Sequence, residues 1–465
     1  MSIPFAMFGI FFAIGLIMFL AFKGWSTIWV APLAACIVAV TGGLHLMDTY
    51  LGAYMTGFAT FSRNFFPAFM LGAIFGKLMD ATLMAKSVAL AISKLFGPKH
   101  AILAVIIAGS ILTYGGVSMF VAVFALFPIC LVLFREANIP RRLIPAAITV
   151  GVFAYTMIAL PGSPQIQNII PGQFFGTPAT AAPVLGIITG IIMAGGGYLW
   201  LIYKEKKVKL AGEHFTEPPN AVAEDSSEVI PSVWVSLLPL LVVVVFLNVL
   251  NRAFGWEIMP ALIFSLALAI LLILVLNIGK RKIFLNSLNE GAKGAMIPII
   301  NVSAIVGFGA VVQASPAFAV LVQALVDIPG NPLISLAIAV NVLCGATGSA
   351  SGGLGIALNA LAETYIVIAQ QYNIPLEVMH RIAALSAGVM DTVPHNGAIL
   401  TLLAVTGMTH KESYFDIFVV TIAIPMAVLI LGLVLAIMGV DGHRGIEAET
   451  LTYCLGHLPA FCGIT

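Results

Sequence analysis

The stretch LPGSPQI, Leu160–Ile166, ends an apolar run that begins near Leu143 and places two prolines, a glycine, a serine and a glutamine there. Proline cannot donate a backbone hydrogen bond, so this composition ends a helix. Pro161 corresponds to Pro394 of a second stretch, VPHNGAI at Val393–Ile399, 233 residues later. Inside a bilayer, irregular backbone is tolerated only where protein or a cavity surrounds it. The two stretches therefore predict two membrane helices that are broken at a buried site.

The composition is that of a polytopic membrane protein. Of the 465 residues, 60% are hydrophobic and 9% are charged, and the mean hydropathy is +1.08. A net charge of +1 favours no nucleic-acid partner, and five scattered cysteines predict neither a metal site nor a disulfide framework. No P-loop sequence is present, so we expect transport driven by an ion gradient, with no cofactor. We expect Ile3–Phe22 to be the first membrane helix and not a cleaved signal.

Ten apolar stretches approach the roughly 20 residues that cross a bilayer. They are Ile3–Phe22, Trp25–Gly42, Phe65–Leu78, Leu143–Leu160, Pro183–Tyr203, Val233–Leu250, Met259–Ile278, Met296–Val312, Ile382–Val393 and Phe415–Val440. Two longer runs are broken at TYGGVS, Thr113–Ser118, and at GATGSASGG, Gly345–Gly353. Each arm of the first has roughly 15 residues, about 22 Å as a helix, against about 30 Å of hydrocarbon. We therefore expect two re-entrant helical hairpins, at residues 100–134 and 332–370.

The chain divides into two similar halves. Short motifs such as the FG pair at Phe75 and the NIP triplet at Asn138 recur in the same order, at offsets near 233, at Phe308 and Asn373. We expect a first repeat at residues 1–203, with its broken helix at 142–172, and a second at 232–440, with its broken helix at 379–408. A charged segment at 204–231 is expected to join them as a cytoplasmic linker, and 441–465 forms a C-terminal tail.

Positive charges predict the orientation of the helices. With the N-terminus outside and each hairpin returning to its own side, 17 of the 21 Lys and Arg residues lie in the cytoplasm. The four exceptions are Arg63, Arg252, Arg381 and Arg444. The halves then enter from opposite sides, and both termini lie on the outer side. The sequence thus predicts an all-α polytopic membrane protein with an inverted repeat, which is typical of secondary transporters.

Four helix starts converge on the interruptions, and each exposes N–H groups with about half a positive charge. We expect a carboxylate to bind there, held by dipoles and hydroxyl groups, because no Arg or Lys is predicted at the midplane. The alternative is that the small residues only let helices pack closely. The candidate substrate-binding residues are Thr113, Tyr114, Gly115, Gly116, Ser118, Gly162, Ser163, Gln165, Thr347, Ser349, Ser351, Gly352, Gly353, Asn359, Thr392 and Asn396.

Three ionisable residues are candidates for proton coupling. Asp391 and His395 flank the second interruption, where ionisable groups are costly and default to a functional hypothesis. A histidine titrates near neutral pH and suits a proton relay. The alternative is that Asp391 braces the break in a polar scaffold with His395. Glu363, on the second arm of the second hairpin, is either a coupling acid or a paired structural charge.

The segments CGATGSASGGLGIALNALAETY, Cys344–Tyr365, and SAGVMDTVPHNGAILTLLAVTGMTHKESY, Ser386–Tyr414, resemble the GntP family of gluconate:proton symporters and related permeases. The branch described as D-beta-hydroxybutyrate permeases is the most similar. The resemblance implies a homodimer of the ion transporter superfamily in a bacterial inner membrane. It also implies that each protomer has a scaffold domain and a mobile, elevator-like transport domain, with binding at Thr113–Ser118, Leu160–Gln165, Gly345–Gly353 and Thr392–Gly397.

The same resemblance orders the substrates. The hairpin tips lack the asparagine of the Ser-Asn-Thr motifs in sodium-linked relatives, and VPHNG departs from the gluconate branch. We therefore expect proton-coupled symport of a short hydroxy-monocarboxylate such as 3-hydroxybutyrate. A gluconate or other sugar-acid symporter and a sodium-coupled dicarboxylate or citrate carrier are the alternatives. A channel fits the repeat poorly, and no nucleophile and base set predicts an enzyme.

Overall fold

The computed structural model describes residues 2–97, 100–114, 119–163, 165–218, 230–326, 328 and 331–439. Within these ranges the regular structure is helical and contains no strand. Seven of the described helices are long and apolar enough to cross a bilayer, or up to nine if each of two bent pairs is one span. The prediction of an all-α, multi-pass protein is confirmed, with fewer long apolar helices than the ten expected spans.

In each half, two helices are followed by short helical turns and then by a longer helix. The first half contains α1 (Ile3–Phe22), α2 (Thr27–Thr41), α3 (Leu46–Thr49), η1 (Tyr50–Tyr54), α4 (Met55–Ala81), α5 (Met84–Phe96), α6 (Ala101–Tyr114), α7 (Met119–Glu136), η3 (Arg141–Leu143), α8 (Ile144–Val152), α9 (Tyr155–Ile158), α10 (Ile166–Phe175) and α11 (Pro183–Leu210). The second contains α12 (Val233–Arg252), α13 (Ile258–Leu276), η4 (Ile278–Ile283), α14 (Phe284–Ala314), α15 (Pro316–Val326), α16 (Pro332–Thr347), α17 (Ala350–Gln371), α18 (Leu376–Val389), η5 (Met390–Thr392), α19 (Gly397–Thr406), α20 (His410–Phe418), η6 (Val419–Ala423) and α21 (Ile424–Ile437).

Two pairs of helices, one from each half, have equal lengths. Helices α1 and α12 each have 20 residues, and α10 and α19 each have 10. Both ten-residue helices end at a glycine in the left-handed region, Gly176 with φ 66° and Gly407 with φ 62°. Asn138 and Asn373, which precede the two broken helices, share a positive φ of 50° and 51°. Gly and Asn are the residues that adopt this conformation most readily, so the same chemistry sets the same turns in both halves.

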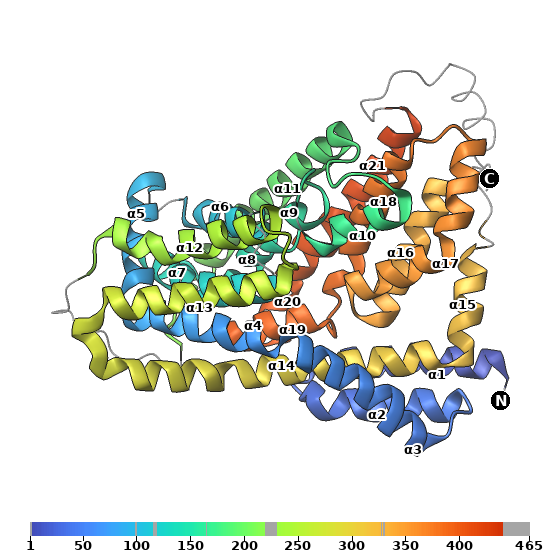
Figure 1. The fold of residues 1–465 in the computed structure, drawn as a ribbon, viewed down its shortest axis with the longest axis horizontal. Helices are drawn as coiled ribbons and strands as arrows, with labels where there is room; N and C mark the ends of the chain where they lie inside the picture. Colours follow the sequence, from blue (N-terminus) through green and yellow to red (C-terminus); the bar gives the residue numbers. More distant parts are fainter. Residues whose placement is uncertain are drawn as a thin grey trace.

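Helices α4 and α14 form a long antiparallel pair, and α14 runs along the lower edge of the view in Figure 1. A Cβ on Gly291 would lie 2.6 Å from Ile74 Cα, and one on Gly307 would lie 2.8 Å from Tyr54 O. These glycines permit the close approach of the two backbones. Both helices are longer than the predicted spans at 65–78 and 296–312, because polar residues at their starts lower the hydropathy without ending the helix.

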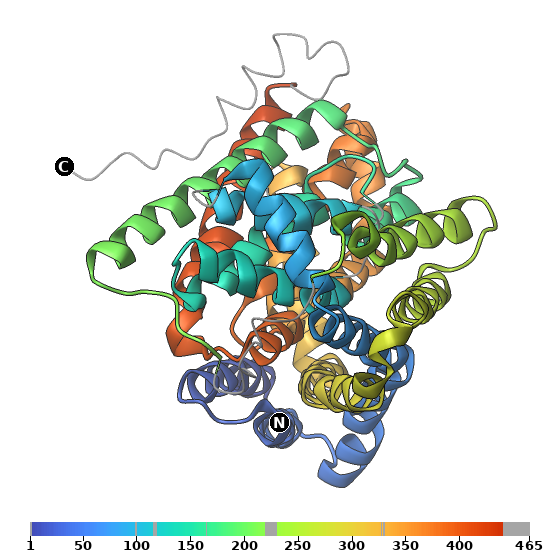
Figure 2. The same cartoon turned by 90° about the vertical axis from the view of Figure 1, so that its left-hand side faces the viewer.

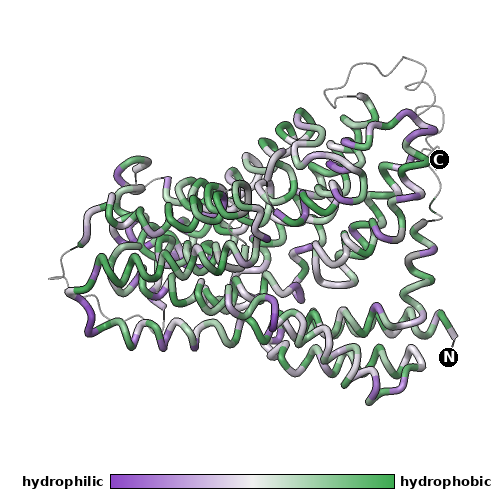
Figure 3. The backbone as a smooth tube through the Cα atoms, viewed as in Figure 1, coloured by the Kyte–Doolittle hydropathy of each residue, from purple (hydrophilic) through white to green (hydrophobic). Residues whose placement is uncertain are grey.

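The first two helices of each half pack against helices of the other half. The α1–α2 pair contacts α14 and α15, and the α12–α13 pair contacts α4 and α5. Figure 2 shows α11 on one flank and the α12–α13 pair on the opposite flank. Hydrophobic residues cover most of the chain, and hydrophilic ones gather mainly at helix ends and turns (Figure 3). Exposed apolar side chains such as Phe8, Ile191 and Trp234 suit contact with lipid.

The hairpin and broken-helix elements interlock between the halves. Helices α16 and α17 are separated by Gly348 and Ser349 and lie side by side, and a Cβ on Gly353 would overlap the backbone of Cys344. Helix α10, beyond the first break, packs against α17 and α18, while α19, beyond the second break, packs against α7. The part of each broken helix beyond its break therefore contacts the hairpin of the other half, while α8 and α18 contact the hairpin of their own half.

Candidate functional site

The second break holds a buried carboxylate at the start of a hairpin arm. Asp391 lies in η5 and is 1% exposed. Its Oδ1 atom accepts hydrogen bonds from the backbone N–H of Ala350 at 2.9 Å and from Nδ2 of Asn396 at 2.8 Å. Its Oδ2 atom is buried and has no hydrogen-bond partner among the described residues. Ala350 is the first residue of α17, so this carboxylate occupies the positive end of that helix.

The start of α17 is also capped by its own side chain. Ser349 adopts an extended conformation, and its hydroxyl accepts a hydrogen bond from the N–H of Gly352 at 3.1 Å. The N–H groups expected to be open for a substrate therefore bind Asp391 and Ser349 in this conformation. Thr347 turns back to donate to Leu343 O at 2.8 Å, while Ser351 is half-buried in the first turn.

Asn396 joins the hairpin tip to the broken helix. Its Oδ1 atom caps α19 by accepting from Ala398 N at 2.6 Å. Its Nδ2 atom donates both to Asp391 and to Gly348 O, the latter at 2.8 Å. Because one amide side chain satisfies three groups from three segments, it fixes Asp391 relative to the tip.

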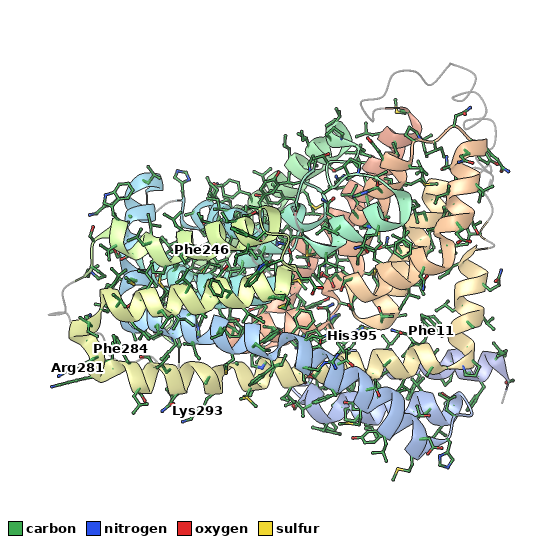
Figure 4. The ribbon with its side chains drawn as sticks, in the orientation of Figure 1. Phe11, Phe246, Arg281, Phe284, Lys293 and His395 are labelled. Carbon is green, nitrogen blue, oxygen red and sulfur yellow. The ribbon has the colours of Figure 1, made fainter. Side chains whose placement is uncertain are left out.

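His395 lies at the opposite end of the same tip. It is 1% exposed, and neither ring nitrogen has a normal hydrogen bond among the described residues, although the Gly345 carbonyl lies close to the ring. A Cβ on Gly348 would lie 3.0 Å from His395 Cδ2. Figure 4 shows His395 in the interior, between the α16–α17 hairpin and α14. The sequence analysis offered a polar scaffold of Asp391 and His395 as an alternative to proton coupling. Among the described residues Asp391 is hydrogen-bonded to Asn396, and no hydrogen bond joins it to His395.

Helix α20 and η6 supply partners for the second break that the sequence analysis missed. His410 donates from Nε2 to Pro394 O at 2.7 Å, and Tyr414 donates to Thr392 O at 2.9 Å. The Thr392 hydroxyl lies 2.6 Å from that of Thr421, in the π-helical turn η6. The spacing of His410 and Tyr414, four residues apart on one helix face, was the available signal.

The first break is held differently. Gln165 donates from Nε2 to Thr113 O at 2.7 Å, and Tyr114 donates to Pro161 O at 3.0 Å. The Thr113 and Ser163 hydroxyls are fully buried and have no partner among the described residues. Helix α10 has no side-chain cap at Gln165, whereas α17 and α19 are both capped. The first break therefore presents the helix start with the more open N–H groups.

Arg381, which the sequence analysis assigned to the outer side of the membrane, is a buried cation beside the first break. It lies in α18, is 0% exposed, and packs behind the first break. Its Nε and Nη2 atoms donate to Ala181 O at 3.1 and 2.7 Å, and Nη1 donates to Asn168 Oδ1 at 2.8 Å. The apolar run began at Ile382, which placed Arg381 outside the span. Helix α18 begins at Leu376, so Arg381 is already in its second turn.

The remaining candidates are placed as follows. Gly162 has φ 79°, which favours glycine, and donates from its N–H to Ala179 O at 2.9 Å. Asn359 and Glu363 are exposed on α17 and make no side-chain hydrogen bond with the Asp391 cluster among the described residues. Gly115, Gly116 and Ser118 lie outside the described residues. No group of three metal-binding side chains occurs in the part of the chain that the structure describes.

The known proteins that resemble this chain are permeases and transporters. A family described as GntP family permease matches residues 5–390. The uncharacterized transporter YxjC of Bacillus subtilis is 40% identical over 452 residues, which cover 89% of this chain and 95% of that protein. An uncharacterized transporter of Haemophilus influenzae is 27% identical over 70% of this chain and 73% of its own. The solved YdaH transporter of Alcanivorax borkumensis aligns with a TM-score of 0.42 at 15% identity, covering 84% of this chain and 88% of that one.

Proposed function

The chain belongs to the GntP family of permeases, and we propose that it is a proton-coupled importer of a short hydroxy-monocarboxylate such as 3-hydroxybutyrate. The observation that carries the proposal is the buried Asp391 carboxylate, which is bonded through one oxygen to the start of α17. The other oxygen has no described partner. A membrane-embedded acid in this position is placed to exchange a proton with a transport pathway.

Proton and substrate binding are linked in this arrangement. Ionised Asp391 provides the negative charge that the start of α17 favours, and it excludes a second carboxylate from the same N–H groups. Protonation removes that charge and weakens the bonds from Ala350 and Asn396, because a neutral carboxyl is a poorer acceptor. Protonation also removes the repulsion between Asp391 and a substrate carboxylate at the first break, where α10 contacts α17. Substrate and proton are therefore carried together, as symport requires.

The two breaks have different roles in the proposal. The first has buried Thr113 and Ser163 hydroxyls and an uncapped helix start, so it holds the substrate. The second also carries Asp391 and His395, so it couples the proton. The imidazole of His395 lies beside the C-terminal end of α16, where a positive charge is favoured, and it provides a second proton-binding group.

The proposed architecture is an inverted repeat that works as an elevator in a homodimer. The similar order of the main helices and the shared turns at Asn138 and Asn373 support the repeat. The α1–α2 and α12–α13 pairs would form the scaffold, and the hairpins with their adjacent broken helices would form the transport domain. We propose the bacterial inner membrane as its location, with both termini outside.

Two other transport functions remain as alternatives. Sugar acids such as gluconate need more hydroxyl partners than the first break offers among its described residues. A sodium-coupled dicarboxylate carrier would need a cation site, and Asp391 is already bonded by Asn396 and Ala350. Both alternatives predict a different driving gradient or substrate preference, so transport assays separate them.

The test is uptake into proteoliposomes that contain the purified full chain. We expect labelled 3-hydroxybutyrate to accumulate when the lumen is more alkaline than the outside, with or without sodium. Gluconate and citrate, offered in excess, should compete weakly. Accumulation that depends on a sodium gradient and ignores the pH gradient would overturn the proton-coupled assignment.

A further inference from the structure

We propose that Arg381 supplies the fixed positive charge that balances the substrate carboxylate at the first break, acting through space. This inference rests on the proposed transport function and narrows the substrate to monoanions. Arg381 is among the largest fully buried side chains in the described chain, and the coupling scheme above does not use it. A buried charge is costly unless it is compensated, so the presence of this guanidinium in the interior requires an explanation.

Every donor of the Arg381 guanidinium is bonded to a neutral acceptor. A guanidinium has five N–H donors. Nε donates to Ala181 O, Nη1 donates to Asn168 Oδ1 and Ile158 O, and Nη2 donates to Ala181 O and Ala179 O. No carboxylate forms an ion pair with it among the described residues. The group is geometrically satisfied, yet its charge has no described counter-ion.

This charge lies directly behind the substrate side of the first break. Asn168 accepts from Arg381 and donates from Nδ2 to Ser163 O and to Ala179 O, both at 2.8 Å. Two hydrogen bonds therefore connect the guanidinium to Ser163. The point that a Cβ on Gly186 would occupy lies 3.2 Å from Arg381 Nε and 3.2 Å from Pro161 Cδ. The guanidinium and the break thus pack against the same small residue.

An anion is the missing partner on the other side of this break. The hydroxyls of Ser163 and Thr113 are 0% exposed side chains without a described partner, and the start of α10 carries no side-chain cap. These groups and the Arg381 charge all favour a carboxylate. One fixed positive charge balances one carboxylate, whereas a dianion would leave one charge uncompensated. The second break differs, because Asp391 already supplies an anion there.

The first experiment removes the charge and keeps the side-chain volume. We compare Arg381→Met with Arg381→Lys, and use His380→Gln as a control that removes bonds to Thr177 and Asn168 without changing the charge of Arg381. The probes are 3-hydroxybutyrate and its neutral amide, measured by competition binding to purified protein. We expect Arg381→Met to lower the affinity for the anion by roughly tenfold or more, and the affinity for the amide far less. Arg381→Lys and His380→Gln should keep the preference for the anion.

A second pair of variants keeps Arg381 in place in case its replacement prevents folding. Asn168→Asp puts a carboxylate against the guanidinium, and Asn168→Leu removes the same amide bonds without adding charge. The inference predicts a larger loss of anion affinity for Asn168→Asp than for Asn168→Leu. Equal losses in both, or equal losses for the acid and the amide in Arg381→Met, would show a structural role only and overturn the inference. A wild-type protein that binds no monocarboxylate would instead overturn the proposed function.

Discussion

At the residue scale, the side chain of Asn396 connects the segments that meet at the second break. It caps α19, bonds the hairpin tip at Gly348 and fixes Asp391. Removing a helix cap costs about 0.5–2 kcal/mol, and leaving a buried acceptor unpaired costs about 1–3 kcal/mol. Replacing Asn396 should therefore lower the free energy of unfolding more than most single substitutions do.

We predict that Asn396→Ala lowers the free energy of unfolding by about 2–4 kcal/mol, from the lost cap and the two lost side-chain bonds. Thermal unfolding of the purified protein in detergent measures the change. Asn359→Ala is the matched control, because Asn359 is exposed on α17 and has no described side-chain bond. Equal shifts for the two variants would contradict the role of Asn396.

The residues that the sequence analysis missed share one property. Arg381 contacts Ala181 and Asn168, which precede it by about 200 positions, and His410 contacts Pro394 only through the folding back of α20. Motif spacing identified Asp391 and Asn396 because they lie within one broken helix. Partners from distant segments leave no local pattern, so only the folded chain brings them to the breaks.

At the scale of elements, the α16–α17 hairpin depends on how closely its two helices approach. A Cβ on Gly353 would overlap the backbone of Cys344, and backbone atoms cannot move aside as a flexible side chain does. Gly355, two residues later on α17, has no atom within 4 Å of the corresponding position. The pair provides a test of hairpin packing within one helix.

We predict that Gly353→Ala destabilises the protein by about 1–3 kcal/mol, because the hairpin arms must separate. Gly355→Ala should be neutral or stabilising by up to about 1 kcal/mol, since alanine favours a helix over glycine. Both are measured as shifts in thermal unfolding. A neutral Gly353→Ala would mean that the arms are not packed as described.

The sequence predicted some elements well and others poorly. The first helix has the predicted bounds, and the Pro-containing stretches lie between α9 and α10 and between η5 and α19. The bounds of α4 and α14 were too short, and α5 and α15 were not recognised as separate helices. Hydropathy marks apolar length, but helices continue into polar turns, and tertiary packing decides where they end.

At the scale of the molecule, the start of the linker folds back over the base of the first half. Glu213 pairs with Arg142 at 2.7 Å, and Glu217 pairs with Arg135 at 2.7 Å. Phe215 donates from its backbone N–H to Asn138 Oδ1 at 3.1 Å. These contacts join the segment after α11 to the C-terminal end of α7, to Asn138 and to η3.

Hydrogen bonding to the Arg142 guanidinium lowers the pKa of Glu213 below its usual range, so this pair stabilises the fold above the unfolded pKa of a glutamate. We predict that Glu213→Gln unfolds at a lower temperature than wild type at pH 7. The difference should shrink as the pH falls through the lowered pKa of Glu213. Glu290→Gln is the control, because its pair with Lys293 is exposed and contributes little. A difference that persists unchanged at low pH would exclude the ion pair as its cause.

In the proposed mechanism, Asp391 carries one proton with each substrate molecule. The direct measurement is proton entry into proteoliposomes that contain a pH-sensitive dye, after 3-hydroxybutyrate is added outside. Wild-type protein should acidify the lumen, and Asp391→Asn should not, while it still exchanges labelled for unlabelled substrate. Equal acidification by Asp391→Asn, or wild-type uptake without acidification, would contradict the account.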